Sequence, residues 1–192
     1  MTSLFPNGYT APKTDATVDF DTTVAPVLSM CDLFGNPVTN DTFCKIVHDG
    51  QNLYVLFKSF FKIKPLPTFD KHGNKVFRDD CVEIFVGNKS TYLELDVSAY
   101  NVLFSAVITN HDGEIEIEEK DGLAETSTVI KDGFYEVKYK IPLSNLKQFG
   151  DLYFNVFRVE MVDGARTSRA SSKTDCLSHH ETRAFMPLNL AK

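Results

Sequence analysis

The sequence predicts an all-β protein, an antiparallel β-sandwich of immunoglobulin-like or jelly-roll-like type, on three observations. Short runs of apolar or alternating residues recur along the chain. Most of these runs end at a turn dipeptide such as Asp-Gly, and no long stretch repeats apolar residues at helical spacing. This cadence is typical of antiparallel sandwiches, whereas parallel sheets need helical segments between their strands.

The expected strands follow one another with short connections. The first hairpin joins 43–48 to 52–61, because Asp49 and Gly50 favour the positive φ of a tight turn. Further strands are expected at 81–86, 91–97, 100–109, 114–119, 123–130, 134–141, 152–161 and 184–190. One helical turn is expected after residue 141, where Pro142 supplies a preset φ.

Length and composition predict one domain over residues 1–192. A chain of 192 residues with 43% hydrophobic residues fits one core, since sandwiches of this size are often undivided. Three stretches show the weakest alternation of apolar and polar residues, at 1–16, 62–76 and 164–181. We expect an irregular arm at 1–16 and functional loops at the other two.

Charge and hydropathy exclude several partners. A net charge of −6, with Lys and Arg scattered singly, would repel nucleic acid and anionic membranes. No apolar run approaches the roughly 20 residues that span a bilayer. The first residues lack a basic head followed by an apolar run, which predicts a cytoplasmic protein, or a secreted one if a signal peptide was removed.

The four cysteines have none of the close spacings that a zinc site or a redox dithiol needs. They are Cys31, Cys44, Cys81 and Cys176. We expect buried free thiols and therefore a reducing compartment, with a disulfide between Cys31 and Cys44 as a minor alternative.

Two expected strands present a polar and aromatic face. Side chains alternate along a strand, so Leu93, Leu95 and Val97 point into the core while Tyr92, Glu94 and Asp96 point the other way. Glu83 joins this second face if 81–86 and 91–97 pair as a hairpin. Carboxylates accept hydrogen bonds from sugar hydroxyls and aromatic rings cover sugar C–H faces. The alternative is an ordinary solvated surface.

Other acidic and histidine residues have competing interpretations. The run from His111 to Gly122 could hold calcium, but its alternation favours a charged edge strand. Asp79, Asp80 and Glu83 could serve a glycosidase, which is the less favoured reading. His179 and His180 would point apart on an extended segment with no third ligand spaced to join them, so no metal site is predicted.

Several segments resemble a known family. DDCVEIF, from Asp79 to Phe85, resembles the D-D-x-V-E-I-F strand entry of type-nine carbohydrate-binding modules and their DOMON-like relatives. Four more segments resemble later or earlier parts of that family: NLYVLFKSF, YEVKYKIPLSNL, LYFNVFRVE and HHETRAFMPLNL. The resemblance spans roughly residues 15–190. It implies a sugar-recognising β-sandwich without catalytic residues or a cofactor, sometimes with structural calcium, and a glycoside hydrolase as partner.

The resemblance also implies site residues. Two tryptophans sandwich the sugar in family members, and this chain has none. Phe77 stands at the first of these positions and His179 near the second. Glu83 matches the sugar-contacting glutamate, whereas Glu94 replaces an arginine. Thr182 and Met186 also depart from the Pro and Gly of the family's ending.

The sequence therefore predicts a non-catalytic carbohydrate-binding module. The expected ligand-binding residues are Phe77, Glu83, Tyr92, Glu94 and His179. The missing tryptophans leave a second hypothesis, a DOMON-like sandwich reused for protein interaction or for another small ligand. A glycoside hydrolase is the least favoured of the three, because no nucleophile elbow, phosphate loop or zinc helix motif is present.

Overall fold

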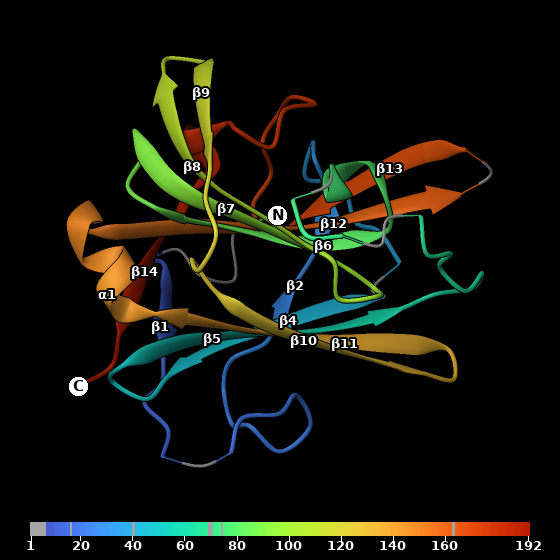
Figure 1. Cartoon of the computed structure of the whole chain (residues 1–192), viewed down its shortest axis with the longest axis horizontal. Helices are drawn as coiled ribbons and strands as arrows, with labels where there is room; N and C mark the ends of the chain where they lie inside the picture. The colour runs from blue at the N-terminus through green and yellow to red at the C-terminus, as the bar shows by residue number, and fades with distance from the viewer. Residues whose placement is uncertain (1–6, 16, 40, 69–70, 74, 163) are drawn as a thin grey trace.

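The computed structural model describes residues 7–192 except 16, 40, 69–70, 74 and 163. It shows two β-sheets packed face to face (Figure 1). Strands make up 51% and helices 7% of the structure, and nearly all strand pairs are antiparallel. The predicted antiparallel β-sandwich is confirmed.

The larger sheet has nine strands in the described part of the chain. Their order is β1 (Tyr9–Ala11), β14 (Met186–Leu190), β12 (Leu152–Val162), β6 (Cys81–Gly87), β7 (Thr91–Ser98), β8 (Leu103–His111) and β9 (Glu114–Glu119), with β13 (Ala165–Ala170) on β12 and β3 (Cys31–Asp32) on β13. β1 pairs with β14 in parallel.

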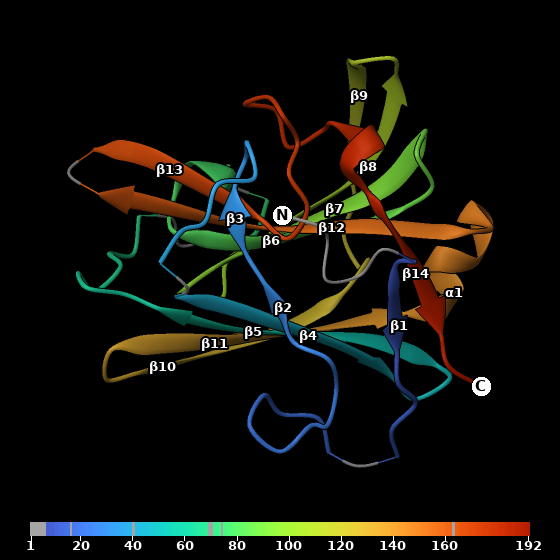
Figure 2. The same ribbon diagram turned by 180° about the vertical axis from the view of Figure 1, so that it is seen from behind.

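The smaller sheet has five strands among the described residues. Their order is β10 (Glu125–Lys131), β11 (Phe134–Pro142), β5 (Asn52–Phe60), β4 (Thr42–His48) and β2 (Leu28–Ser29). β2 leads directly into β3, so this short stretch of chain crosses from one sheet to the other (Figure 2). The short helices are η1 (Val76–Arg78), α1 (Leu143–Leu146), η2 (Lys147–Phe149) and η3 (Thr182–Ala184).

The core lies between the sheets and follows the predicted alternation. Leu93, Leu95 and Val97 of β7 are fully buried and pack in one cluster with Val82, Ile84 and Val86 of β6. The opposite sheet contributes alternate residues of β5 and β11. They include Leu53, Val55, Phe57, Tyr135, Val137, Tyr139 and Ile141. The predicted inward face of the central strands is therefore confirmed.

The first predicted hairpin is confirmed at the β4–β5 turn. Gly50 adopts a φ of 90°, which few residues besides glycine adopt readily. Asp49 Oδ1 accepts hydrogen bonds from the backbone N–H groups of Gln51 at 2.7 Å and Asn52 at 2.6 Å. This carboxylate therefore holds the turn that sets the register of the two strands.

Two strands form where the sequence predicts irregular chain. The expected arm at 1–16 contains β1, in which Tyr9 is fully buried and bonds to the carbonyl of Ile46; residues 1–6 and 16 lie outside the described residues. The expected loop at 164–181 begins with β13. β13 is mostly exposed, so it has no apolar alternation to reveal it, and its ladder with β12 stabilises it.

Other boundaries shift by a few residues. The strand expected at 100–109 begins at Leu103, because Asn101 takes a φ of 62° in the preceding turn. The final strand begins at Met186, because η3 occupies 182–184. The helical turn after Pro142 is confirmed as α1. No helix in the described part of the chain is long and apolar enough to cross a membrane.

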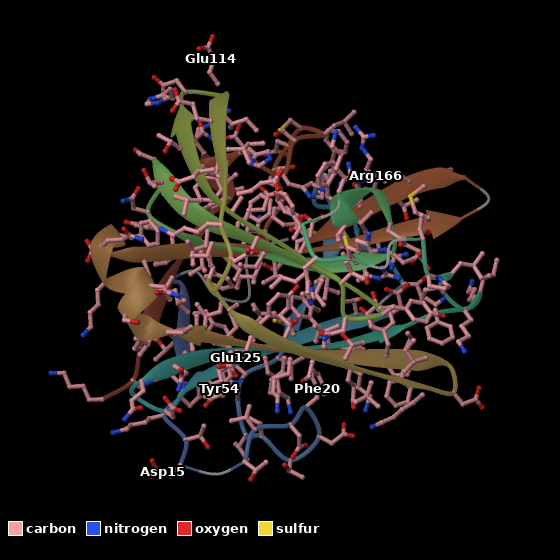
Figure 3. The ribbon with its side chains drawn as sticks, viewed as in Figure 1. Asp15, Phe20, Tyr54, Glu114, Glu125 and Arg166 are labelled. Carbon is pink, nitrogen blue, oxygen red and sulfur yellow. The ribbon has the colours of Figure 1, made fainter. Side chains whose placement is uncertain are left out.

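The acidic run near residue 115 forms β9, at one edge of the larger sheet. Every residue of β9 is exposed, and Glu114 projects at the tip of the β8–β9 hairpin (Figure 3). The charged edge strand predicted in preference to a calcium loop is confirmed. The cysteines are free thiols, of which Cys44 and Cys81 are buried while Cys31 and Cys176 are half-buried.

Leu95→Ala should lower the free energy of unfolding by about 2–5 kcal/mol, because it opens a cavity in the shared core. The matched control is Ile117→Ala on β9, where the side chain is 53% exposed and truncation should change stability by less than about 1 kcal/mol. Urea unfolding of both variants checks this. Equal losses would show that the core does not lie on this face of β7.

Candidate functional site

The predicted polar face lies on the outer side of the larger sheet. In the β6–β7 hairpin Glu83 opposes Asp96, and Phe85 opposes Glu94. Opposed residues point to the same side, so these four side chains and Tyr92 share one face. This face is not a solvated surface, because Glu83 is 1% exposed, Glu94 5% and Tyr92 0%. The alternative of an ordinary exposed face is wrong.

A covering segment, residues 171–185, links β13 to β14 and contacts this face. Its Phe185 packs in a second apolar cluster with Phe85, Tyr92 and Phe157 of the sheet. At its start, Ser171 N–H donates to the carbonyl of Val156 on β12. The sheet thus has a second buried layer outside the sandwich core.

His179 fits the outer face through ring stacking and a hydrogen bond. Its imidazole stacks on Phe157 with the ring centroids 4.3 Å apart and an interplanar angle of 2°. Its Nδ1 donates to Glu83 Oε2 at 2.7 Å. Burial alone would raise the pKa of Glu83, but the charge and hydrogen bond of His179 hold that pKa below its usual value. Glu83 therefore stays ionised.

Two further carboxyl groups lie beside this pair. Burial, together with the neighbouring Glu83, raises the pKa of Glu94 to about 8. Burial also raises the pKa of Asp96 well above its usual value. Within the described residues, neither oxygen of Asp96 receives a hydrogen bond from an N–H or hydroxyl donor. Near neutral pH Glu94 is held mostly as a neutral acid, and the raised pKa of Asp96 favours its neutral form as well, because a second charge beside Glu83 would be desolvated.

His180 lies on the same face as His179, and the prediction that the two side chains point apart is wrong. The chain turns at these residues instead of extending. His180 Nδ1 and the Tyr92 hydroxyl form a hydrogen bond of 2.8 Å, and Nε2 lies 3.9 Å from Glu94 Oε2. Burial lowers the pKa of His180 to about 4, so this ring is neutral at pH 7.

Phe77 lies apart from His179, over the neighbouring strand. It is half-buried in η1 and packs edge-on against Phe104 of β8, with centroids 5.9 Å apart. Phe104 opposes Asp96 in the β7–β8 ladder, so Phe77 borders the carboxylate face. The structure therefore brings Glu83, Tyr92 and Glu94 together beneath the covering segment, which contributes His179, and places Phe77 at the margin.

The two aspartates offered as glycosidase residues make structural contacts. Asp80 Oδ1 accepts a hydrogen bond of 2.9 Å from Arg158, whose side chain is 1% exposed and lies over the Tyr135 ring. Asp79 accepts from the Thr68 hydroxyl at 3.1 Å. Among the described residues, no group of three or more His, Cys, Asp or Glu side chains is arranged to hold a metal ion.

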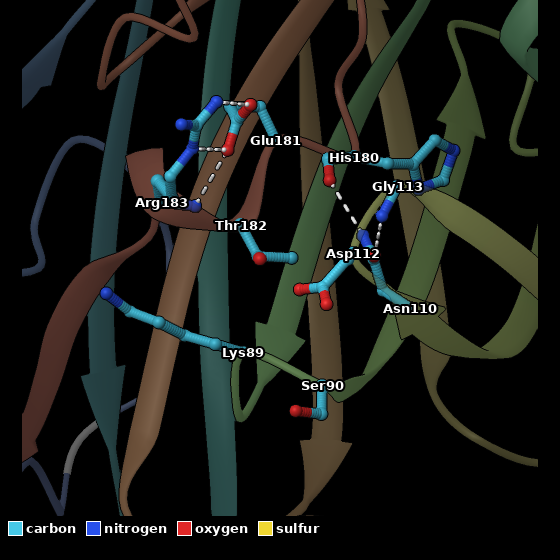
Figure 4. A pocket seen from close by; sticks show the side chains of 9 residues that line it. All are labelled: Lys89, Ser90, Asn110, Asp112, Gly113, His180, Glu181, Thr182 and Arg183. Carbon is cyan, nitrogen blue, oxygen red and sulfur yellow. Dashed lines mark hydrogen bonds and ion pairs between the residues drawn. The ribbon is translucent and has the colours of Figure 1, made fainter.

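A polar hollow of about 480 Å³ opens beyond His180, near the turns of the β6–β7 and β8–β9 hairpins (Figure 4). Its lining residues are Lys89, Ser90, Asn110, Asp112, Gly113, His180, Glu181, Thr182 and Arg183. Sequence reasoning missed this hollow, because its walls come from segments that are far apart in the chain. Phe157 was also missed, since only strand pairing places β12 beside Glu83.

Glu94→Gln should flatten the pH dependence of stability. A pKa raised to about 8 in the folded state means that stability is lost as pH rises from about 5 to 8, because the fold retains a proton that the unfolded chain releases. Gln keeps the side chain neutral throughout. Relative to wild type, the variant should gain about 1–3 kcal/mol between pH 5.5 and pH 9.

Chemical unfolding at the two pH values measures the effect. The control is Glu116→Gln on exposed β9, which should follow the wild-type pH profile. Wild-type pH dependence in the Glu94 variant would mean that Glu94 is ionised in the fold.

Comparison with known proteins identifies solved structures with the same fold and the family of the chain. Five solved chains match its fold, and three of them are the following. One is a crystal structure of a putative carbohydrate-binding protein from Bacteroides uniformis, with a TM-score of 0.73 and 13% identity over 96% of this chain and 100% of that one. A family 9 carbohydrate-binding module from Caldicellulosiruptor kristjanssonii in complex with cellotriose has a TM-score of 0.64 at 15% identity, covering 95% of this chain and 92% of that one.

The same module in complex with glucose has a TM-score of 0.62 at 15% identity, covering 95% of each chain. No curated protein is significantly similar in sequence. Residues 24–183 match the family described as "Carbohydrate family 9 binding domain-like", which is more than four-fifths of the chain. With the two-sheet fold and the DDCVEIF strand, this match shows that the chain belongs to the carbohydrate family 9 binding domain-like family.

Proposed function

We propose that this chain, acting as one domain, binds carbohydrate without altering it, on the outer face of its larger sheet. The single observation that carries this proposal is the geometry around Glu83, whose carboxylate lies on the strand next to the flat ring of Phe157, directly opposite it in the ladder. Sugar recognition needs a charged acceptor for hydroxyl groups and an aromatic surface for the C–H face. Membership of the family supports the same function.

The ring of His179 takes up both of these contacts in the structure. It is flat, it stacks on Phe157, and it donates to Glu83, as a sugar ring with a hydroxyl group would. Glu83 and His179 are 1% and 7% exposed, so a ligand reaches Glu83 only when His179 moves. His179 Nε2 has no hydrogen-bond partner among the described residues. The ring is therefore held by its stacking on Phe157 and by its single hydrogen bond to Glu83.

The proposed partner is a glycoside hydrolase that cleaves the recognised glycan. The contacts of Asp79 and Asp80 with Thr68 and Arg158 leave neither aspartate disposed for general acid or base chemistry. In this proposal the chain binds the glycan and the partner enzyme cleaves it.

Cellotriose and glucose are suitable test ligands, because a fold relative was solved with each. Calorimetric titration of the wild type should show saturable binding at millimolar concentration or below. Glu83→Gln should weaken binding by about 1–2 kcal/mol, because it keeps the shape and removes the charge that strengthens hydrogen bonds to hydroxyls. Phe77→Ala should weaken binding by about 1–3 kcal/mol if a sugar reaches the margin of the face.

The matched control is Phe134→Ala, which removes another half-buried ring, on the opposite sheet, where it packs against Phe60. It should leave affinity unchanged. Absence of binding to cellotriose, glucose and an array of plant and microbial glycans would refute the proposed function.

A further inference from the structure

The polar hollow is separate from the covered face around Glu83, and three segments build it. These are the β6–β7 turn, the β8–β9 turn and the end of the covering segment (Figure 4). The hollow is open to solvent, and its volume of about 480 Å³ falls within the usual range of roughly 300–1,000 Å³ for small-molecule sites.

Asn110 forms hydrogen bonds with all three segments that line the hollow. Its backbone N–H donates to the carbonyl of Ser90 at 2.7 Å, and its side-chain Nδ2 donates to the carbonyl of His180 at 2.9 Å. Its Oδ1 accepts from the N–H of Gly113 at 2.8 Å. Asn110 is 9% exposed, so these bonds are shielded from water. The frame is thus organised before any ligand arrives, which reduces the entropy lost on binding.

Several polar side chains that line the hollow make no hydrogen bond or ion pair with the other described residues. The side chains of Ser90, Asp112 and Thr182 form no hydrogen bond to the other described residues. The Lys89 ammonium lies 5.0 Å from the centre of the Tyr153 ring and forms no ion pair or hydrogen bond within the described part of the chain. Figure 4 shows the Asp112 carboxylate and the Thr182 side chain directed toward the space between the segments. Together they provide an ammonium donor, a carboxylate acceptor and two hydroxyls that donate and accept.

The charges in the hollow cancel. Glu181 accepts two hydrogen bonds of 2.7 Å from the Arg183 guanidinium, so these two residues neutralise each other. Lys89 and Asp112 carry the second pair of opposite charges. His180 adds none at neutral pH. A phosphate or a carboxylate would meet no net positive charge here, whereas a neutral ligand rich in hydroxyl groups finds both donors and acceptors.

We infer that this hollow is a second binding site, specific for a neutral polyol such as the terminal unit of an oligosaccharide. The inference deepens the proposed function and rests on it. The site is open in the structure, whereas the face around Glu83 is closed by His179. His180 forms a wall of the hollow and bonds to Tyr92 of the covered face, so the two sites lie next to each other.

The test titrates cellotriose, with inorganic phosphate as the anionic probe, into the ¹⁵N-labelled chain. Cellotriose should shift the amide signals of Gly113 and Thr182, and phosphate should not. Asp112→Asn with Thr182→Val should weaken the binding reported by these signals about tenfold, because Asn keeps an acceptor oxygen but loses the charge, and Val loses the hydroxyl group. Asn tolerates the φ of 53° at position 112, so the turn is kept.

The control is Asp121→Asn, which changes another Asp in an Asp-Gly turn, outside the hollow, and should leave affinity unchanged. Cellotriose binding that Glu83→Gln weakens, without shifts at Gly113 and Thr182, would overturn the second site and leave the proposed function standing. Stronger binding of phosphate than of cellotriose at these amides would overturn the ligand class. Absence of any saccharide binding would refute both proposals.

Discussion

The two-residue alternation of β6 and β7 is the constraint on which the rest of the structure depends. It sends Val82, Ile84 and Leu95 into the sandwich core and sends Glu83 and Glu94 outward. A shift of one residue in either strand would put carboxylates between the sheets, so the apolar side enforces the register. The polar outer face is therefore positioned by the packing of the core on the opposite side of the same strands.

The covering segment turns this outer face into a second buried layer. Burial of several carboxyl groups beside one another is unfavourable unless charge is removed or paired. The structure meets this requirement by pairing Glu83 with His179 and by raising the pKa values of Glu94 and Asp96, which favours their neutral forms. Protonation of these acids and closure of the segment are thus coupled, because exposure to water would restore their ordinary ionisation.

The covered face and the hollow have contrasting chemistry. The covered face combines the Phe157 ring with a single ionised acceptor, Glu83, and suits a ligand with an apolar side. The hollow presents hydrogen-bonding groups fixed by Asn110 between hairpin turns. Because His179 packs on the covered face and His180 borders both that face and the hollow, movement of this dipeptide would affect both regions.

The sequence by itself determined the strand succession and the inward face, because alternation and turn dipeptides are local properties that core packing reinforces. It also placed Glu83 and Glu94 on one side, since one hairpin relates them. Only the tertiary structure decided that this side is buried, that both histidines turn onto it, and that β13 is a strand. Each of these depends on contacts between distant segments, such as Phe157 with His179, and no local pattern encodes them.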